Sequence, residues 1–348
     1  MDRTVLIDGR WVGIGGPGRV AELLLGGLGL ERPPGRWLIW GPEKLDEYLW
    51  PGAELVPSRH HAKAWYSQRD FPGPRGRADV AYYPHQLRPA WRLAPVEITT
   101  IHDTIPFRYP PNAVSGVALR AHFRWMARLS TMIVTDSEFS KRSIEADLRV
   151  APNRVRVLSL PIDHESAARV RAIRLAGSAA DRAVFVGRDA PHKNLDRLVR
   201  AFARTEANRR GGRLLLVGVD GPSVRRLETL AGAEGVHLDL AGVVGQDELE
   251  RLLAGSAVLV QPSTEEGFGL PVAEAMAAGM PVAVSSGGSL PEITRGLVEP
   301  FDPLDIDAIA GAIDTAFASD ATSQIEWPGP AEFARSALAA IDAACSMR

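Results

Sequence analysis

The sequence contains one cysteine, Cys345, among its 348 residues. A single cysteine excludes a disulfide framework and a metal site built from cysteines, and it is compatible with the reducing cytoplasm in which we expect this protein. Lysine is also scarce, because 36 of the 40 basic residues are arginines and only four are lysines. A lysine within a motif of this chain is therefore more informative than an arginine.

A strong charge of either sign and long apolar runs are missing as well. The formal net charge of −2 argues against a nucleic-acid-binding protein. The stretch from Val20 to Leu30 is too short to span a bilayer and is interrupted by Glu22, so we expect a soluble protein. Residues 1–163 carry 22 basic and 17 acidic residues, a net +5, whereas the remainder carries 18 and 25, a net −7. A mildly basic first half suits an acidic partner or peripheral contact with an anionic membrane surface.

Length and periodicity predict two α/β domains. A chain of 348 residues is long for one domain, and short apolar runs alternate with amphipathic helical patterns in both halves. This alternation is typical of parallel sheets. Residues 164–181 lack strand character, and we predict a short linker there. The sequence FPGPRGR at 71–77 predicts a surface loop.

The most informative stretch is AVLVQPSTEEGFGLPVAEAMAAG at 257–279. A buried strand ends in a Gly-rich turn, and a helix restarts at Pro271, which places Glu266 in the loop and Glu274 in the helix's first turn. Both carboxylates and the free N–H groups of residues 267–270 should face the crevice at the carboxyl end of a parallel sheet. Such a crevice suits a ligand rich in hydroxyls. The alternative is that Glu274 only favours the helix N-terminus through its charge, worth ~0.3–1 kcal/mol.

A second candidate site is AVFVGRDAPHKNLDRLVRAF at 183–202. A buried strand delivers Arg188 into a loop, Lys193 follows five residues later, and Asn194 can cap the next helix. Two cations near a helix start form a site for a pyrophosphate. The alternative is a solvent-exposed basic turn.

A glycine loop follows the first predicted strand. Gly13, Gly15 and Gly18 satisfy the pattern G-x-G-x-x-G, so an enzyme that uses NAD is one alternative. However, the glycines do not follow the strand directly, and the candidate second strand, WLIW at 37–40, ends in Gly-Pro with no acid placed to hold a ribose. We therefore favour a loop in which Gly15 and Gly16 let the backbone approach a phosphate or a sugar.

The predicted strand VEITTIHD at 96–103 ends in His102 and Asp103. The carboxyl end of a strand is where an α/β domain exposes functional groups. The alternative is a structural histidine that bonds to a loop carbonyl.

The run EGFGLPVAEAMAAGMPV at 266–282, followed by SLPEI, resembles the donor-binding segment of retaining nucleotide-sugar glycosyltransferases of glycosyltransferase family 4, whose pattern is Glu, seven residues, Glu. The resemblance implies a GT-B fold, in which two Rossmann-like domains face a cleft. By this resemblance residues 1–165 would bind the acceptor and residues 180–325 the nucleotide sugar. Residues 326–348 would form a helix that crosses back to the first domain.

The resemblance also implies roles for individual residues. The residues expected at the catalytic centre are His102, Asp103 and Glu266; those at the donor diphosphate are Arg188, Lys193, Gly15 and Gly16; those at the nucleoside are Glu274, Val243, Val244 and Leu270; and those at the donor sugar are Gly267, Phe268 and Gly269. No Asp-x-Asp metal motif stands in a suitable place, so we expect neither a metal nor a cofactor.

The pairing of IDGR at 7–10 with HDTIPFRYP at 102–110 resembles GDP-mannose-dependent mannosyltransferases. The prediction is therefore retaining, metal-independent transfer of a hexose, first of all mannose from GDP-mannose, to a hydroxyl of a glycan, lipid-linked or small-molecule acceptor. A UDP-sugar donor, a nucleotide-sugar epimerase and a non-catalytic nucleotide-sugar-binding protein are the alternatives.

Overall fold

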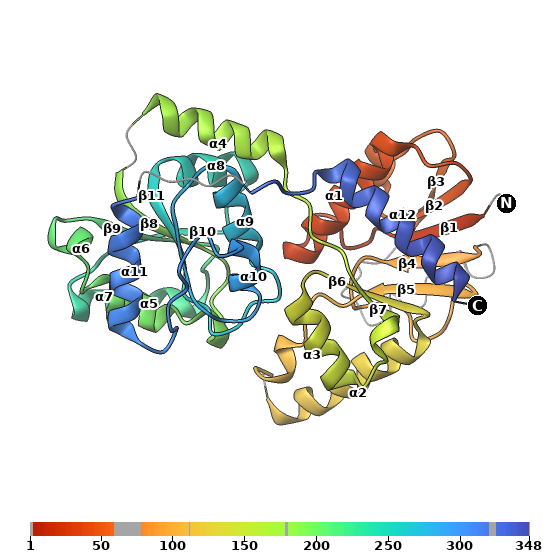
Figure 1. The fold of residues 1–348 in the computed structure, drawn as a ribbon, viewed down its shortest axis with the longest axis horizontal. Helices are drawn as coiled ribbons and strands as arrows, with labels where there is room; N and C mark the ends of the chain where they lie inside the picture. Colours follow the sequence, from red (N-terminus) through yellow and green to blue (C-terminus); the bar gives the residue numbers. More distant parts are fainter. Residues whose placement is uncertain (1–2, 59–77, 111, 178–179, 320–324, 348) are drawn as a thin grey trace. The chain divides into compact units, whose positions relative to one another are not determined.

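A computed structural model describes residues 3–58, 78–110, 112–177, 180–319 and 325–347 (Figure 1). The predicted loop at 71–77 lies outside these ranges. The chain divides into two compact units, of which the first comprises Met1–Pro161 and Pro328–Arg348 and the second comprises Ile162–Trp327. Each unit is built around its own parallel sheet.

The sheet of the first unit has seven strands in the order β3-β2-β1-β4-β5-β6-β7. Its strands are β1 (Thr4–Asp8), β2 (Arg36–Gly41), β3 (Ala53–Pro57), β4 (Val80–Tyr83), β5 (Val96–Thr100), β6 (Met132–Thr135) and β7 (Val155–Val157). The inner strand β1 is apolar and buried because helices cover both faces of a parallel sheet. Ile7 of β1 pairs in register with Ile39 on one side and Tyr82 on the other.

Helices of the first unit pack on this sheet through separate apolar clusters. They are α1 (Gly15–Glu31), α2 (Ala113–Leu129), α3 (Glu138–Leu148) and α12 (Pro330–Ser346), with short 3-10 turns η1 (Glu43–Tyr48), η3 (Ile105–Phe107) and η4 (Pro152–Arg154). One cluster includes Leu6, Trp40 and Tyr83, and another joins Phe123 of α2 to Ile144 of α3. Ser137 caps α3, because its Oγ accepts a hydrogen bond from Ser140 N at 3.0 Å.

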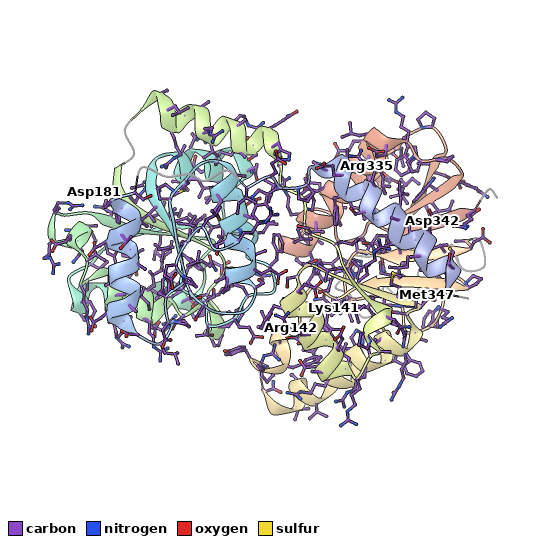
Figure 2. All side chains as sticks on the ribbon, viewed as in Figure 1. Lys141, Arg142, Asp181, Arg335, Asp342 and Met347 are labelled. Atoms are coloured by element: carbon purple, nitrogen blue, oxygen red, sulfur yellow. The ribbon has the colours of Figure 1, made fainter. Side chains whose placement is uncertain are left out.

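The last helix, α12, packs along α1 (Figure 1). Gly27 permits this contact, since a Cβ there would lie 2.0 Å from the carbonyl oxygen of Pro330. Two ion pairs flank the contact: Arg335 Nη1 lies 2.5 Å from Glu31, and Asp342 lies 2.7 Å from Arg3. Figure 2 labels Arg335 and Asp342 along α12.

The sheet of the second unit has five strands in the order β10-β9-β8-β11-β12. Its strands are β8 (Ala180–Val186), β9 (Arg213–Val217), β10 (His237–Gly242), β11 (Ser256–Gln261) and β12 (Val282–Val284). Its helices are α4 (His164–Ala176), α5 (Leu195–Phe202), α6 (Glu206–Arg209), α7 (Pro222–Glu234), α8 (Gln246–Ala254), α9 (Leu270–Ala277), α10 (Leu290–Thr294) and α11 (Ile306–Phe317), with the 3-10 turn η5 (Pro191–Lys193). The predicted parallel sheets are confirmed.

The predicted linker at 164–181 is wrong, because most of it forms α4. Asp163 caps the helix by accepting hydrogen bonds from Glu165 N and Ser166 N, both at 3.1 Å. Helix α4 packs on α8, and Glu250 of α8 accepts hydrogen bonds from Arg169 at 2.8 and 2.7 Å. The second unit therefore begins at Ile162, rather than at the predicted residue 180, and runs to Trp327.

Candidate functional site

The candidate site of the second unit lies where β8 and β11 end side by side in the sheet. The loop after β8 carries Arg188 and ends at Lys193, and the loop after β11 carries Glu266. The parallel strands deliver both loops to the same edge of the sheet, as open α/β folds do for their ligands.

Glu266 and Lys193 form an ion pair at the centre of this site. Lys193 Nζ lies 2.6 Å from Glu266 Oε1, and Ser263 Oγ and Gln261 Nε2 donate to the same oxygen at 2.7 and 2.5 Å. Glu266 is only 6% exposed, whereas the Lys193 side chain is 20% exposed. Within the described residues no donor reaches Glu266 Oε2, so this oxygen is available to a ligand.

The Glu266 carboxylate stays ionised despite its burial. Burial alone would raise the pKa of Glu266, but the Lys193 ammonium and the Ser263 hydroxyl outweigh it and hold the pKa below its ordinary value. The site therefore presents an anion and a cation in contact at neutral pH.

The loop after β12 packs tightly against the Glu266 loop. A Cβ on Gly287 would lie 2.3 Å from Ser263 O, and one on Gly288 would lie 2.3 Å from Glu266 O. Ser289 completes the contact, because its N–H donates to Glu266 O at 3.1 Å and its Oγ donates to Phe268 O at 2.8 Å. The two loops thus hold each other, and the position of Glu266 depends on small residues in both.

Asn194 has a different role from the one we predict. It adopts a left-handed φ of 62° before α5, and its side chain does not cap that helix. Its amide nitrogen instead donates to Pro262 O at 3.0 Å and to Pro303 O at 2.7 Å. The Asn194 side chain does not cap α5 because its amide instead connects the loop after β8 to the loop after β11. This contact fixes Lys193 next to Glu266.

Glu274 lies one residue deeper in α9 than predicted, just beyond the first turn. The helix begins at Leu270 because Gly269, with a φ of +93°, makes the turn into it, so no acidic residue lies in its first turn. The favourable effect of a negative charge falls off beyond the first turn. The alternative in which Glu274 only stabilises the helix N-terminus is therefore weakened.

The remaining predicted residues of the second unit differ in exposure. Arg188 is exposed, and Val243, after β10, is 74% exposed, an unusual position for a valine. Phe268 is 6% exposed, and its ring packs edge-on against Trp327 at 6.0 Å between centroids. Its side chain is therefore part of the core. Gly267 and Gly269 share the loop with Phe268, Leu270 begins α9, and Val244 lies in the turn after β10.

In the first unit His102 pairs with Asp136 rather than with its neighbour Asp103. His102 Nδ1 lies 2.7 Å from Asp136 Oδ2, and both side chains are buried. Asp103 Oδ1 instead accepts a hydrogen bond from Ile105 N at 3.0 Å and so shapes the turn after β5. Burial alone would lower the pKa of His102, but the Asp136 carboxylate outweighs it and raises this pKa above its ordinary value.

The sequence analysis missed Asp136 and a second buried group, Asp8 with Arg10 and His85. Arg10 Nε and Nη2 donate to the two carboxylate oxygens of Asp8 at 2.9 and 2.7 Å, and His85 Nε2 lies 3.4 Å from Asp8 Oδ2. Arg10 holds the pKa of Asp8 well below its usual range, against the effect of burial, which would raise it. Burial also lowers the pKa of His85.

These groups follow neighbouring strands at one edge of the first sheet. Asp8 ends β1, His85 and His102 lie two residues after β4 and β5, and Asp136 directly follows β6; these strands are consecutive in the sheet. A signal was available in the sequence, because each polar residue stands just after a short apolar run that reads as a strand.

The glycine loop also belongs to the first unit. Gly15 and Gly16 begin α1, and a Cβ on Gly16 would have nothing within 4 Å in the described structure. Gly18 has the structural role in this loop, since a Cβ there would lie 2.3 Å from Trp11 O. The structure thus places Gly15 and Gly16 in one unit and the predicted diphosphate ligands Arg188 and Lys193 in the other. Among the described residues, no group of three His, Cys, Asp or Glu side chains could hold a metal ion.

Comparison with known sequences agrees with this architecture. Residues 171–325 match the family model described as Glycosyl transferases group 1. The O-antigen chain mannosyltransferase B of Escherichia coli is 28% identical over 283 residues, which cover 76% of this chain and 71% of that protein. The MMP alpha-(1->4)-mannosyltransferase of Mycolicibacterium hassiacum is 30% identical over 202 residues, covering 54% of this chain but only 46% of that protein. This chain thus spans less than half the length of the second relative.

Comparison with solved structures identifies the fold. Anabaena HepE, solved in complex with UDP and glucose, matches with a TM-score of 0.72 at 16% identity, covering 98% of this chain and 100% of that one. The predicted GT-B class, with two parallel-sheet α/β domains, is confirmed.

Proposed function

We propose that this chain, whose residues 171–325 match the family model of the group 1 glycosyltransferases, transfers a hexose from a nucleotide sugar to an acceptor hydroxyl. The observation that carries the proposal is the ion pair between Lys193 and Glu266, at 2.6 Å on the carboxyl edge of the second sheet. One residue of the pair suits a diphosphate and the other suits sugar hydroxyls.

The Glu266 carboxylate is organised to hold a sugar. Its Oε1 accepts three hydrogen bonds from Lys193, Ser263 and Gln261, which fixes its orientation. Its Oε2 is left to accept a hydrogen bond from a hydroxyl of the donor sugar. The adjacent backbone N–H groups at the start of α9 can donate to the same ligand.

Lys193 and Arg188 supply the positive charge that a leaving diphosphate requires. Lys193 is fixed by the turn before α5, whereas Arg188 is exposed and can close onto a phosphate. Each charge-assisted contact contributes roughly 1.5–3 kcal/mol. We therefore propose transfer without a divalent cation, with stabilisation of the departing charge by these two side chains and helix N-termini.

We propose retention at the anomeric carbon. The acceptor oxygen attacks that carbon on the face from which the diphosphate leaves. The bond from the carbon to the phosphate oxygen breaks with its electron pair moving to the phosphate, and a phosphate oxygen takes the proton of the acceptor hydroxyl. Glu266 then orients the sugar, and His102 and Asp103 are proposed to line the acceptor side.

Mannose from GDP-mannose is the first donor we propose, because two relatives are named mannosyltransferases. A UDP-sugar is the second candidate, because HepE was solved with UDP. The proposed acceptor is a hydroxyl of a glycan, a lipid-linked sugar or a small molecule.

The first test is a thermal-shift panel with GDP, UDP, ADP, dTDP and NAD, each with and without EDTA, because a ligand that binds the native state raises Tm. We expect GDP to stabilise the protein equally in both conditions. Stabilisation by NAD alone would overturn the proposal, and loss of stabilisation in EDTA would overturn its metal independence.

The second test follows the release of GDP from GDP-mannose with candidate acceptors. Glu266→Ala should lower the transfer rate about 100-fold or more, because a preorganised contact to the reacting sugar is lost. Glu248→Ala, at an exposed glutamate of α8, is the control. A wild-type rate in Glu266→Ala would refute the role of Glu266. Donor consumption without acceptor would indicate an epimerase, and binding without GDP release a non-catalytic protein.

A further inference from the structure

Helix α2 of the first unit exposes apolar side chains along one side. Val114, Val117 and Trp125 are 80%, 72% and 48% exposed, and Ala118 and Ala121 are exposed between them. A helix turns by 3.6 residues, so these positions fall on one stripe about three turns long. The opposite side of the same helix is buried, as expected for a helix packed on a sheet.

A row of arginines runs beside this stripe. Arg120, Arg124 and Arg128 follow one another at intervals of four residues, and all are exposed. The helix contains no Asp or Glu from residue 113 to residue 129. We call the apolar stripe and the arginine row together the α2 face.

The α2 face is held in place by its own contacts. Trp125 Nε1 donates to Ala90 O at 2.8 Å, so its ring is fixed although half of it is exposed. Arg120 Nη2 donates to Phe107 O at 2.9 Å, and Arg124 Nη2 donates to Asp147 O at 3.3 Å. These contacts engage only carbonyl oxygens, which leaves the arginine charges uncompensated by them.

We propose that the α2 face docks on the surface of an anionic lipid bilayer. A helix that carries arginines beside exposed valine and tryptophan has the composition of interfacial helices, which bury the apolar side at the headgroup boundary. The tryptophan suits this boundary, because its ring is apolar and its N–H is polar. No helix in the described part of the chain is long and apolar enough to cross a membrane. A helix of this composition lies in the plane of the membrane interface.

Charge complementarity selects a lipid surface over a protein partner. Asp147, whose carbonyl oxygen accepts the hydrogen bond from Arg124, has its carboxylate paired with Arg108 at 3.1 Å, so it does not neutralise the arginine row. A continuous anionic surface can pair with every arginine of the row, whatever the rotation of the protein about the membrane normal. A single protein partner does not need to pair with the row in every orientation. Docking through this face would bring the acceptor-binding unit to lipid-linked hydroxyls, but the proposal does not depend on the proposed reaction.

The test is co-sedimentation of the full chain with vesicles of phosphatidylcholine, with or without about 30% phosphatidylserine. We expect binding only to the anionic vesicles, and weaker binding at high salt. The double variant Arg124→Ala, Arg128→Ala should lower the partition coefficient about 25-fold, since each basic residue near an anionic surface contributes about fivefold. Val114→Gln with Val117→Gln should weaken binding without changing the salt dependence.

Matched controls come from the second unit. Arg225→Ala with Arg251→Ala removes two exposed charges, and Leu175→Gln with Leu304→Gln removes two exposed leucines. Both control variants should bind vesicles like the wild type. Equal weakening by the controls, or no anionic binding by the wild type, would overturn the proposal. Concentration-dependent self-association that the α2 variants abolish, without vesicle binding, would instead make the face a protein interface.

Glycosyl transfer to a soluble acceptor should be unchanged in the α2 variants. This readout separates the two proposals, because a failed docking test leaves transfer intact, whereas a failed transfer test leaves docking intact.

Discussion

Lys193 Nζ donates to Glu266 Oε1 over 2.6 Å, and so joins two residues that we predict to hold different parts of the donor. Lys193→Ala should raise the Kd for GDP about 10- to 100-fold, the equivalent of one charge-assisted contact. It should also raise the pKa of Glu266, because Lys193 is the strongest influence that lowers it against burial. Isothermal titration calorimetry measures the Kd.

Lys141→Ala is the control, since Lys141 lies on α3 of the first unit and is labelled in Figure 2. An unchanged Kd in Lys193→Ala would contradict the diphosphate assignment. An equal loss in Lys141→Ala would make the effect one of overall charge.

The contact of His102 with Asp136 predicts a pH dependence of stability. The pKa of His102 is raised although burial would lower it, so the pair stabilises the folded state below the unfolded pKa near 6.5. That contribution is lost as the pH rises through the raised folded pKa. In Asp136→Asn, burial should become the dominant influence and lower the pKa of His102 below 6.5, as an NMR titration of the His102 ring would show.

Asp103→Asn is the matched control, because the Asp103 carboxylate shapes the turn to Ile105 and contributes less to the pKa of His102. A similar fall in the His102 pKa in both variants would refute the specific pairing with Asp136.

Much of the fold could be predicted because its strands are short apolar runs. Strands buried on both faces of a parallel sheet need continuous apolar sequence, and the run AVLV of β11 and the run AVFV of β8 show it clearly. Helix α4 was missed because its mixed sequence has no clear apolar stripe, and Asp163 and the contact with Glu250 specify it instead.

Only the part of the candidate site that lies within one short segment could be predicted from the sequence. Glu266 stands in a dense local motif, whereas its partner Lys193 is 73 residues away and the pairing follows from the order of β8 and β11 in the sheet. The same holds for His102 and Asp136, 34 residues apart on neighbouring strands. The predicted role of Asn194 as a helix cap was wrong because asparagine suits both a helix cap and an amide contact between two loops.

Glu250 should stabilise the second unit by tying α4 to α8. Hydrogen bonds from Arg169 lower the pKa of Glu250 to about 2, although burial opposes the shift. This stabilisation is present above the unfolded pKa near 4.5 and is lost as the pH falls toward 2. Glu250→Gln should lower the free energy of unfolding by about 2 kcal/mol at neutral pH, as urea denaturation measures.

Glu248→Gln on the same helix is the control, because Glu248 pairs with Arg251 at the surface and should change stability by less than about 0.5 kcal/mol. If both variants lose equal stability, Glu250 does not have the anchoring role.

Adjacent glycines of α1 make a matched pair for testing how α12 packs. A Cβ on Gly27 would lie 2.0 Å from Pro330 O, whereas a Cβ on Gly26 would have nothing within 4 Å in the described structure. Gly27→Ala must therefore push α12 away and should cost about 1–3 kcal/mol. Gly26→Ala should instead stabilise by about 0.5–1 kcal/mol, because alanine favours a helix interior over glycine. Thermal unfolding measures both, and stabilisation of equal size in both variants would show that α12 does not approach α1 this closely.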